Sequence, residues 1–152
     1  MSFESGEMAA PPKDADGYVE PHDDPREIPD DSYVVRRIHR DWLKPISGNR
    51  RELSKGAFAP SSKRHDRYQG MSVDIFDRLN DDGVDPASRL KPDQEAAVII
   101  RAGDLRRLGL EIGPDPTQDN DKYHASVWGI RGTHKKKIRA FSDWLFKPAD
   151  VD

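Results

Sequence analysis

The sequence predicts a single compact α+β domain: a small mixed or antiparallel sheet with a few short helices and a C-terminal amphipathic helix, preceded by a disordered acidic arm. Three observations lead to this prediction. Residues 33–38 are rich in β-branched side chains, as expected for a first strand. Residues 96–102 form the clearest apolar run of the chain, which is typical of a buried strand. Towards the C-terminus, apolar residues recur at helical spacing and define one core face: Ile138, Phe141, Trp144 and Leu145.

The first half of the domain contains one further apolar stretch and one polar loop. After the first strand, Trp42 and Leu43 are core candidates, and Pro45 is expected to stop the element. Residues 50–58 are mostly polar but offer Leu53 and Phe58 as apolar anchors. Residues 60–70 are rich in Ser, Lys and Arg, which predicts an exposed loop.

The second half alternates short helices with strands. A short helix capped by Ser72 is expected, because Ile75, Phe76 and Leu79 would share one face. Asp104 can cap another short helix over residues 105–108. Residues 110–112 and 123–130 follow as an edge strand and a second strand, so strands and short helices are mixed along the whole domain.

The charge of the chain is distributed unevenly. Residues 1–31 contain ten acidic residues against Lys13 and Arg26, a net charge of −8, so residues 32–152 carry +5. The arm is rich in Pro and poor in large apolar side chains, so its composition predicts disorder. It would act as a solubilising leader, as a shield over the basic domain, or as a tether to a partner.

Composition also limits the compartment and the chemistry. The chain has no cysteine, which excludes disulfides, thiolate metal sites and a cysteine nucleophile. No apolar run is long enough to span a membrane, and the N-terminus lacks the pattern of a secretion signal. We therefore expect a cytoplasmic protein without membrane contact.

The strongest candidate for function is a basic stretch between residues 36 and 67. Its ten cations face three acids, and aromatic side chains that can stack on bases lie among them. Clustered arginines match the geometry of phosphate and are typical of nucleic-acid-binding surfaces. A solvated basic face, or a docking surface for the acidic arm, is the alternative. The residues predicted to bind phosphate here are Arg36, Arg37, Arg50 and Arg51.

A second basic group lies at the start of the last helix. Lys135, Lys136 and Lys137 follow Gly132, and cations in a first helical turn oppose the helix dipole, which favours anions there. Either these lysines form an anion site, or they are simply exposed and the helix begins after them.

His39 and His124 are the candidates for acid–base chemistry. Each lies in a predicted strand beside apolar residues, where a histidine is often structural. If they converge with Arg37 and Ser54, the four side chains could act on a phosphate or a ribose. The histidines show no metal-ligand spacing, and no nucleotide-binding motif indicates a cofactor. Asp41, Asp74 and Asp77 would be the carboxylates of a magnesium-dependent nuclease site.

Several short motifs resemble a group of small bacterial proteins of uncharacterised function over roughly residues 33–148. They are Arg36-Arg-Ile-His, Arg50-Arg-Glu-Leu-Ser followed by Ala57-Phe58, Met71-Ser-Val-Asp, and His124-Ala-Ser-Val after Asp115-Pro. A fainter likeness is to ADP-ribosyltransferase-like folds. In those folds an early strand offers Arg or His and a following strand offers Ser to bind a nicotinamide dinucleotide. Arg37, His39 and Ser54 would fill these places, although no third-strand Glu is evident.

Three hypotheses for function follow. The first is a module that binds a nucleic acid or another phosphate-bearing ligand, in which neutralising Arg50 and Arg51 would reduce the salt dependence of binding. The second is an enzyme acting on nucleotides or nucleic acids through His39 and His124. The third is an accessory or immunity-type protein that docks a protein partner through an exposed apolar patch.

Overall fold

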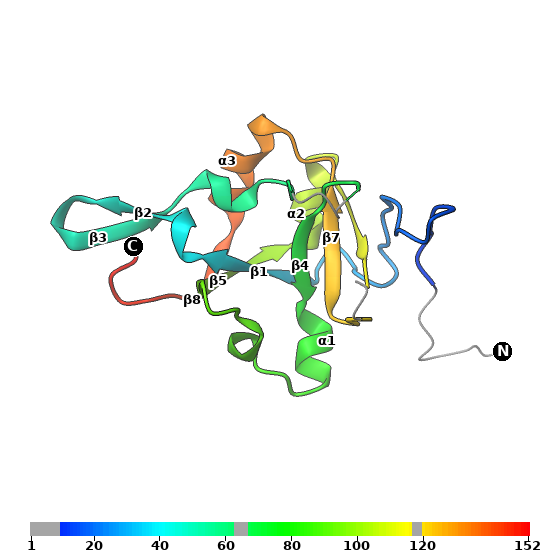
Figure 1. Ribbon diagram of the computed structural model, residues 1–152, viewed down its shortest axis with the longest axis horizontal. Helices are drawn as coiled ribbons and strands as arrows, with labels where there is room; N and C mark the ends of the chain where they lie inside the picture. The colour runs from blue at the N-terminus through cyan, green and yellow to red at the C-terminus, as the bar shows by residue number, and fades with distance from the viewer. Residues whose placement is uncertain (1–9, 63–66, 117–119) are drawn as a thin grey trace.

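The computed structural model describes residues 10–62, 67–116 and 120–152, and within them the chain forms the predicted α+β fold (Figure 1). The three α-helices of the described residues are α1 (Phe76–Asp81), α2 (Ala102–Arg107) and α3 (Gly132–Phe141). The strands are β1 (Tyr33–His39), β2 (Leu43–Ile46), β3 (Arg50–Leu53), β4 (Met71–Ile75), β5 (Gln94–Arg101), β6 (Glu111–Pro114), β7 (His124–Trp128) and β8 (Asp143–Phe146). Short 3-10 helices also occur: η1 (Arg40–Trp42), η2 (Ser47–Asn49), η3 (Lys55–Phe58) and η4 (Pro86–Arg89).

Six of these strands form one antiparallel sheet in the order β6-β7-β4-β1-β5-β8. The strand β1 lies inside the sheet, where Val34 pairs with Ile75 of β4 and with Ile100 of β5. Because side chains alternate along a strand, Val34 and Ile38 face one side of the sheet and Val35 faces the other. The β-branched residues that predicted this strand thus fill both faces.

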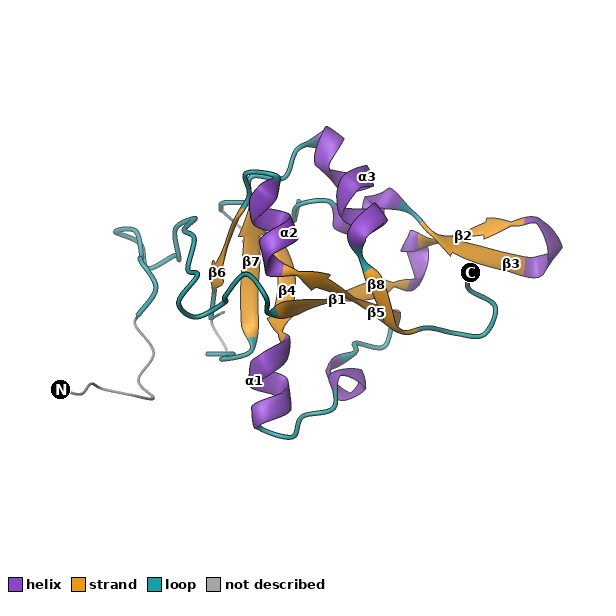
Figure 2. Cartoon of the chain, turned by 180° about the vertical axis from the view of Figure 1, so that it is seen from behind, coloured by secondary structure: helices purple, strands orange, loops and turns teal. Residues whose placement is uncertain are grey.

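The two faces of the sheet are covered differently. The helices α2 and α3 lie over one face, as Figure 2 shows, and bury Leu105 and Ile138 in the main core with Val34 and Ile38. On the opposite face, α1 contributes Leu79 to a small cluster with Val35 and Ala97. Partly buried hydrophobic residues such as Phe76 and Ile99 pack against this cluster, and polar side chains lie beside it on the same face.

The strands β2 and β3 pair as a separate hairpin that projects from one end of the molecule (Figure 1). Pro45 lies within β2 and does not end the element, which is possible because a two-stranded hairpin leaves edge positions where no N–H is needed. The C-terminal segment returns to this hairpin, and Val151 forms a parallel bridge with Arg51. Val151 is fully buried, so the chain end is part of the fold.

For residues 10–31 the structure differs from the expected disorder, because this part of the arm packs against the domain. Ile28 is fully buried in the main core, and the backbone N–H of Asp24 donates to the carbonyl of Ile112 at 2.9 Å. Gly113 permits the approach, since a Cβ there would lie 2.4 Å from His22 Nε2. The prediction of disorder for residues 1–9 concerns positions outside the described residues.

The acids of the arm form ion pairs with arginines of the domain. Arg106 lies 2.9 Å from Asp23 and 2.8 Å from Asp30, and Arg67 contacts Asp14 and Asp16. A segment with few apolar residues can therefore be ordered, because one buried isoleucine and several charge-assisted hydrogen bonds offset its conformational entropy.

Three boundaries also differ from the predictions. The helix α2 begins at Ala102, so Asp104 lies in its first turn and is not its cap. Residues 71–75 form a strand before α1 begins at Phe76, so Ser72 is a strand residue and not a helix cap. At the C-terminal end, α3 stops at Phe141, and Trp144 and Leu145 belong to β8. In the described part of the chain, no helix has the length and apolar character needed to cross a membrane.

Candidate phosphate-binding surface

Arg36 is an internal residue in the fold. It lies on the core face of β1, where its Nε and Nη1 donate to the carbonyls of Ala57 and Ser72, each at 2.9 Å. The guanidinium also lies 4.7 Å from the centre of the Trp42 ring. Burial lowers the pKa of Arg36 to about 10, with a further contribution from the charge of Arg37, so the side chain stays protonated at neutral pH. Arg36 thus links β1, β4 and the segment at η3.

Arg37 lies on the other face, in a network of charges around Asp74. Its Nε is 3.4 Å from Asp74 Oδ2, and Arg89 Nη2 is 2.8 Å from Asp74 Oδ1. Arg89 also reaches Asp121 at 2.6 Å. Asp74 is only 1% exposed, and these two guanidinium groups are its charge partners.

His124 is the cross-strand neighbour of Asp74, so the predicted residues Arg37 and His124 flank the same carboxylate. The ring of His124 is buried, and its Nδ1 lies 2.5 Å from the carbonyl of Asp115. Because a carbonyl oxygen only accepts, Nδ1 is the donor in this contact. The fold therefore brings two of the four predicted acid–base and ligand residues to one place.

His39 and Ser54 lie elsewhere. His39 ends β1, where Nδ1 accepts from the N–H of Asp41 at 3.0 Å and Nε2 lies 2.8 Å from Asp93. Ser54 follows the hairpin, its Oγ is buried, and this hydroxyl has no partner among the described residues. No contact within the described part of the chain joins Ser54 to Arg37, His39 or His124. The four side chains that an acid–base site would require therefore do not meet in one place.

Arg50 and Arg51 bind the C-terminal segment. Arg51 holds both carboxylate oxygens of Asp150, at 2.8 and 2.9 Å, and also reaches Glu95 at 3.0 Å. Arg50 donates twice to Asp152 and once to the carbonyl of Ala149. The hydrogen bonds that Arg51 donates to Asp150 and Glu95 raise the pKa of Arg51 further above its ordinary value. Both guanidinium groups therefore already have carboxylate partners.

The basic side chains of α3 have no such partners. Lys135, Lys136 and Lys137 lie within this helix, which begins before them at Gly132, and its first turn contains no acid. No side-chain hydrogen bond or ion pair joins the three lysines to any residue that the structure describes. Of the two interpretations of these lysines, a helix that starts after them is wrong, whereas their exposure is confirmed for Lys136 and Lys137.

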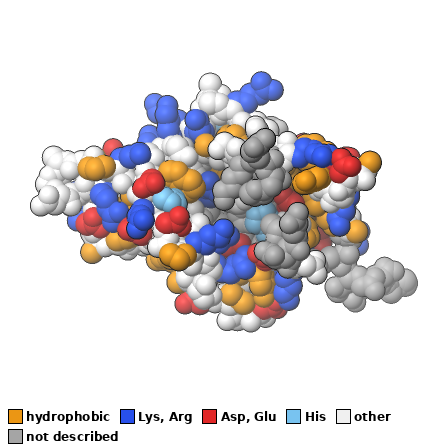
Figure 3. Space-filling model, in the orientation of Figure 1, with side chains coloured by type: hydrophobic (Ala, Val, Ile, Leu, Met, Phe, Trp, Pro, Cys, Tyr) orange, Lys and Arg blue, Asp and Glu red, His pale blue; other side chains and the backbone are white. Residues whose placement is uncertain are grey.

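Two arginines extend this group along the helix. Arg131, Lys135 and Arg139 are spaced by four residues and lie on one side of α3. Together with Lys136 and Lys137 they form what we call the α3 basic strip, and Lys55 of η3, which packs against α3, is exposed nearby. Figure 3 shows Lys and Arg side chains gathered at the top of the molecule, where α3 lies in Figure 1.

The sequence-based predictions did not include Arg131 or Arg139. The spacing of four residues from Arg131 through Lys135 to Arg139 was the signal that could have found them, once the start of the helix was known.

Two hollows lie at the ends of the strip. At its C-terminal end, Arg139 lines a pocket of about 320 Å³. At its N-terminal end, Arg131 lines a shallower hollow of about 250 Å³ with Tyr68 and Ile130. None of the described residues form a group of three or more side chains suited to hold a metal ion. Asp41, Asp74 and Asp77 are thus not gathered into a carboxylate cluster there.

No protein-family model, curated protein or solved structure matches this chain. The resemblance drawn from its short motifs stays a prediction.

Proposed function

We propose that this protein is a binding module for nucleic acid, which contacts the phosphates of its ligand through the α3 basic strip. One observation carries the proposal. The nine residues 131–139 include five cations and no acid, and none of these cations has a carboxylate partner among the described residues. Unpaired cations clustered on one short helix are the electrostatic footprint expected of a surface that contacts a phosphate backbone.

The ion pairs of the acidic arm also support a phosphate-binding role for the α3 basic strip, because they leave the cations of the strip unpaired. Its described acids pair with Arg67, Arg78 and Arg106, on other parts of the domain. The arm thus neutralises arginines away from α3, and the negative net charge of the whole chain does not cancel the local charge of the strip. This arrangement limits binding to one side of the molecule.

The two alternatives have less support. An acid–base enzyme would need His39 beside His124, and each ring instead makes its own separate contacts. A docking surface for a protein partner would show a broad apolar patch. In the described residues, the large hydrophobic side chains counted as exposed are Tyr18 and Tyr33, at 38% and 36%.

The test is the salt dependence of binding to short labelled oligonucleotides, followed by fluorescence anisotropy. In the variant Lys135→Ala/Lys136→Ala/Lys137→Ala, the affinity at low salt should fall. The slope of log K against log salt should become shallower by about 0.7 for each lost phosphate contact on a single strand.

A matched control removes the same charge from another part of the surface. Arg40, Lys44 and Lys91 are exposed and form no ion pair within the described residues. Replacing all three by alanine should leave the affinity and the slope nearly unchanged. If both variants lose affinity equally, the loss reflects net charge and not a contact made by α3. If the wild-type chain binds no oligonucleotide at low salt, the proposal is refuted.

A further inference from the structure

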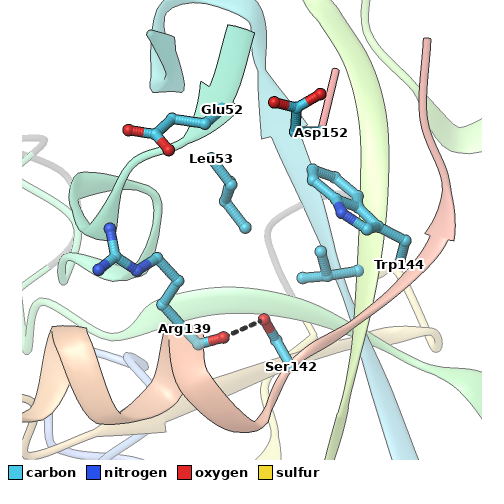
Figure 4. Close-up of a pocket in the computed structure, with 7 residues that line it drawn as sticks. Glu52, Leu53, Arg139, Ser142, Trp144 and Asp152 are labelled. Atoms are coloured by element: carbon cyan, nitrogen blue, oxygen red, sulfur yellow. Dashed lines mark hydrogen bonds between the residues drawn. The ribbon is translucent and has the colours of Figure 1, made fainter. Parts of the chain in front are cut away.

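The pocket at the C-terminal end of the α3 basic strip combines an aromatic wall, an apolar floor and a charged rim. It is lined by the hairpin, by β5 and β8, by the end of α3 and by the chain terminus: Glu52, Leu53, Val98, Arg139, Ser142, Trp144 and Asp152. Its volume of about 320 Å³ lies at the lower end of the range of small-ligand pockets, roughly 300–1,000 Å³. Figure 4 shows Leu53 pointing into the space between Arg139 and Trp144.

Trp144 is held in place by the sheet. It belongs to the edge strand β8, where its backbone pairs with Val98 of β5, and its side chain is partly buried against the main core. A ring fixed in this way can present one face to a flat ligand without losing much conformational freedom. The wall of the pocket is therefore suited to stacking.

The charged rim has two side chains that are available to a ligand. Glu52 and Arg139 form no ion pair within the described part of the chain, and Figure 4 shows them on the same side of the pocket. Asp152, in contrast, is held by Arg50 at 2.6 Å. A free carboxylate accepts hydrogen bonds from an exocyclic amino group of a base, as Glu and Asp do with cytosine. The free guanidinium of Arg139 is suited to a phosphate.

Arg139 belongs both to this pocket and to the α3 basic strip. At about 1.5 Å per residue, the strip from Arg131 to Arg139 is about 12 Å long, so it can contact more than one phosphate of a strand. A strand whose phosphates followed α3 would thus bring a base to the mouth of the pocket.

We propose that the pocket binds one amino-bearing base of a single-stranded nucleic acid, stacked on Trp144, while the phosphates of the same strand lie along the α3 basic strip. This inference rests on the proposed phosphate-binding function of α3. The ligand is a single strand because a base that is paired and stacked in a duplex cannot enter a pocket of this kind.

The experiment compares a short single-stranded oligonucleotide with its abasic counterpart, which has the same phosphates and no bases. The wild-type chain should bind the base-bearing strand more tightly, and its tryptophan fluorescence should be quenched. Stacking on an aromatic side chain contributes about 1–3 kcal/mol, so Trp144→Leu should weaken binding of the base-bearing strand roughly 5- to 150-fold. Binding of the abasic strand should not change.

A second variant controls for folding and assigns the fluorescence signal. Trp144→Phe keeps an aromatic ring in the pocket, so it should retain most of the affinity and lose the quenching. If both Trp144 variants bind the base-bearing strand as tightly as the wild-type chain, the pocket inference is overturned. In that case the variant Lys135→Ala/Lys136→Ala/Lys137→Ala should still bind both strands more weakly than the wild-type chain, and the proposed phosphate contact would stand. If the lysine variant binds both strands like the wild-type chain, the proposed function itself fails.

Discussion

Arg89 shows how one side chain can join two distant acids of this chain. Its Nη2 lies 2.8 Å from Asp74 and 2.6 Å from Asp121, and its guanidinium is 5.2 Å from the centre of the Tyr123 ring. Burial tends to raise the pKa of Asp121, but the hydrogen bonds from Arg89 and from the N–H of Tyr123 outweigh it, so the pKa lies below the ordinary 3.8. The ionised carboxylate of Asp121 is therefore favoured more in the folded state than in the unfolded state.

This pKa shift predicts an acid-dependent part of the stability. A carboxylate whose pKa is lowered by folding contributes its full stabilisation above its unfolded pKa of about 3.9 and loses it as pH falls through the folded value. The free energy of unfolding of Asp121→Asn should thus lie below that of the wild-type chain near neutral pH. The difference should shrink as pH falls below the ordinary pKa of an aspartate. Urea unfolding over a pH series measures this, and a difference that stays constant with pH would show that Asp121 is not stabilised by Arg89.

At the residue scale, the sequence indicated which types of side chain matter but not which arginines have partners. Arg50 and Arg51 looked free because the nearby sequence has few acids, but Asp152 and Asp150 lie 102 and 99 residues further on. Such pairs depend on the folded path of the C-terminal segment and are invisible to local charge counts. Arg37 and His124 share the face that carries Asp74 only because β4 pairs with both β1 and β7, which the local sequence does not show.

At the scale of elements, the sheet with its short helices followed from apolar patterns, whereas three helix boundaries did not. Trp144 and Leu145 fit the helical spacing of Ile138 and Phe141, yet the exposed edge of β5 pairs with residues 143–146 and converts them into a strand. Pairing with a free edge overrides local periodicity because it satisfies backbone donors and acceptors that would otherwise lack partners. The same change moves Trp144 from a helix face to the wall of the pocket.

The described part of the arm packs against the domain, although its composition predicts disorder. This packing can be tested at Ile28. Ile28 is fully buried in the main core. Ile28→Ala should therefore lower the free energy of unfolding by about 2–5 kcal/mol, as for other large-to-small core substitutions. Chemical denaturation measures the change.

Arg26 provides the control, because it lies two residues away, is exposed and forms no ion pair with any described residue. Arg26→Ala should change the stability by less than about 0.5 kcal/mol. If Ile28→Ala is equally neutral, the arm does not pack against the domain in solution.

At the scale of the whole molecule, the uneven charge of the chain has a structural explanation. The arm carries −8 and the remainder +5, and five of the arm's acids form ion pairs with Arg67, Arg78 and Arg106. The C-terminal acids neutralise Arg50 and Arg51 in the same way. The cations of α3 are outside both sets of pairs. A near-neutral protein can thus keep one strongly basic surface.

The most direct test of this account is to map the binding surface of the full chain by backbone amide chemical shifts during titration with a single-stranded oligonucleotide at low salt. We predict that the largest shifts fall on residues 131–139 and on the pocket at Glu52, Leu53 and Trp144. Arg37 and the C-terminal ion pair of Arg51 should show little change. Shifts centred on Arg37, Asp74 and His124, with α3 unaffected, would contradict the account and move the binding site to the opposite face of the sheet.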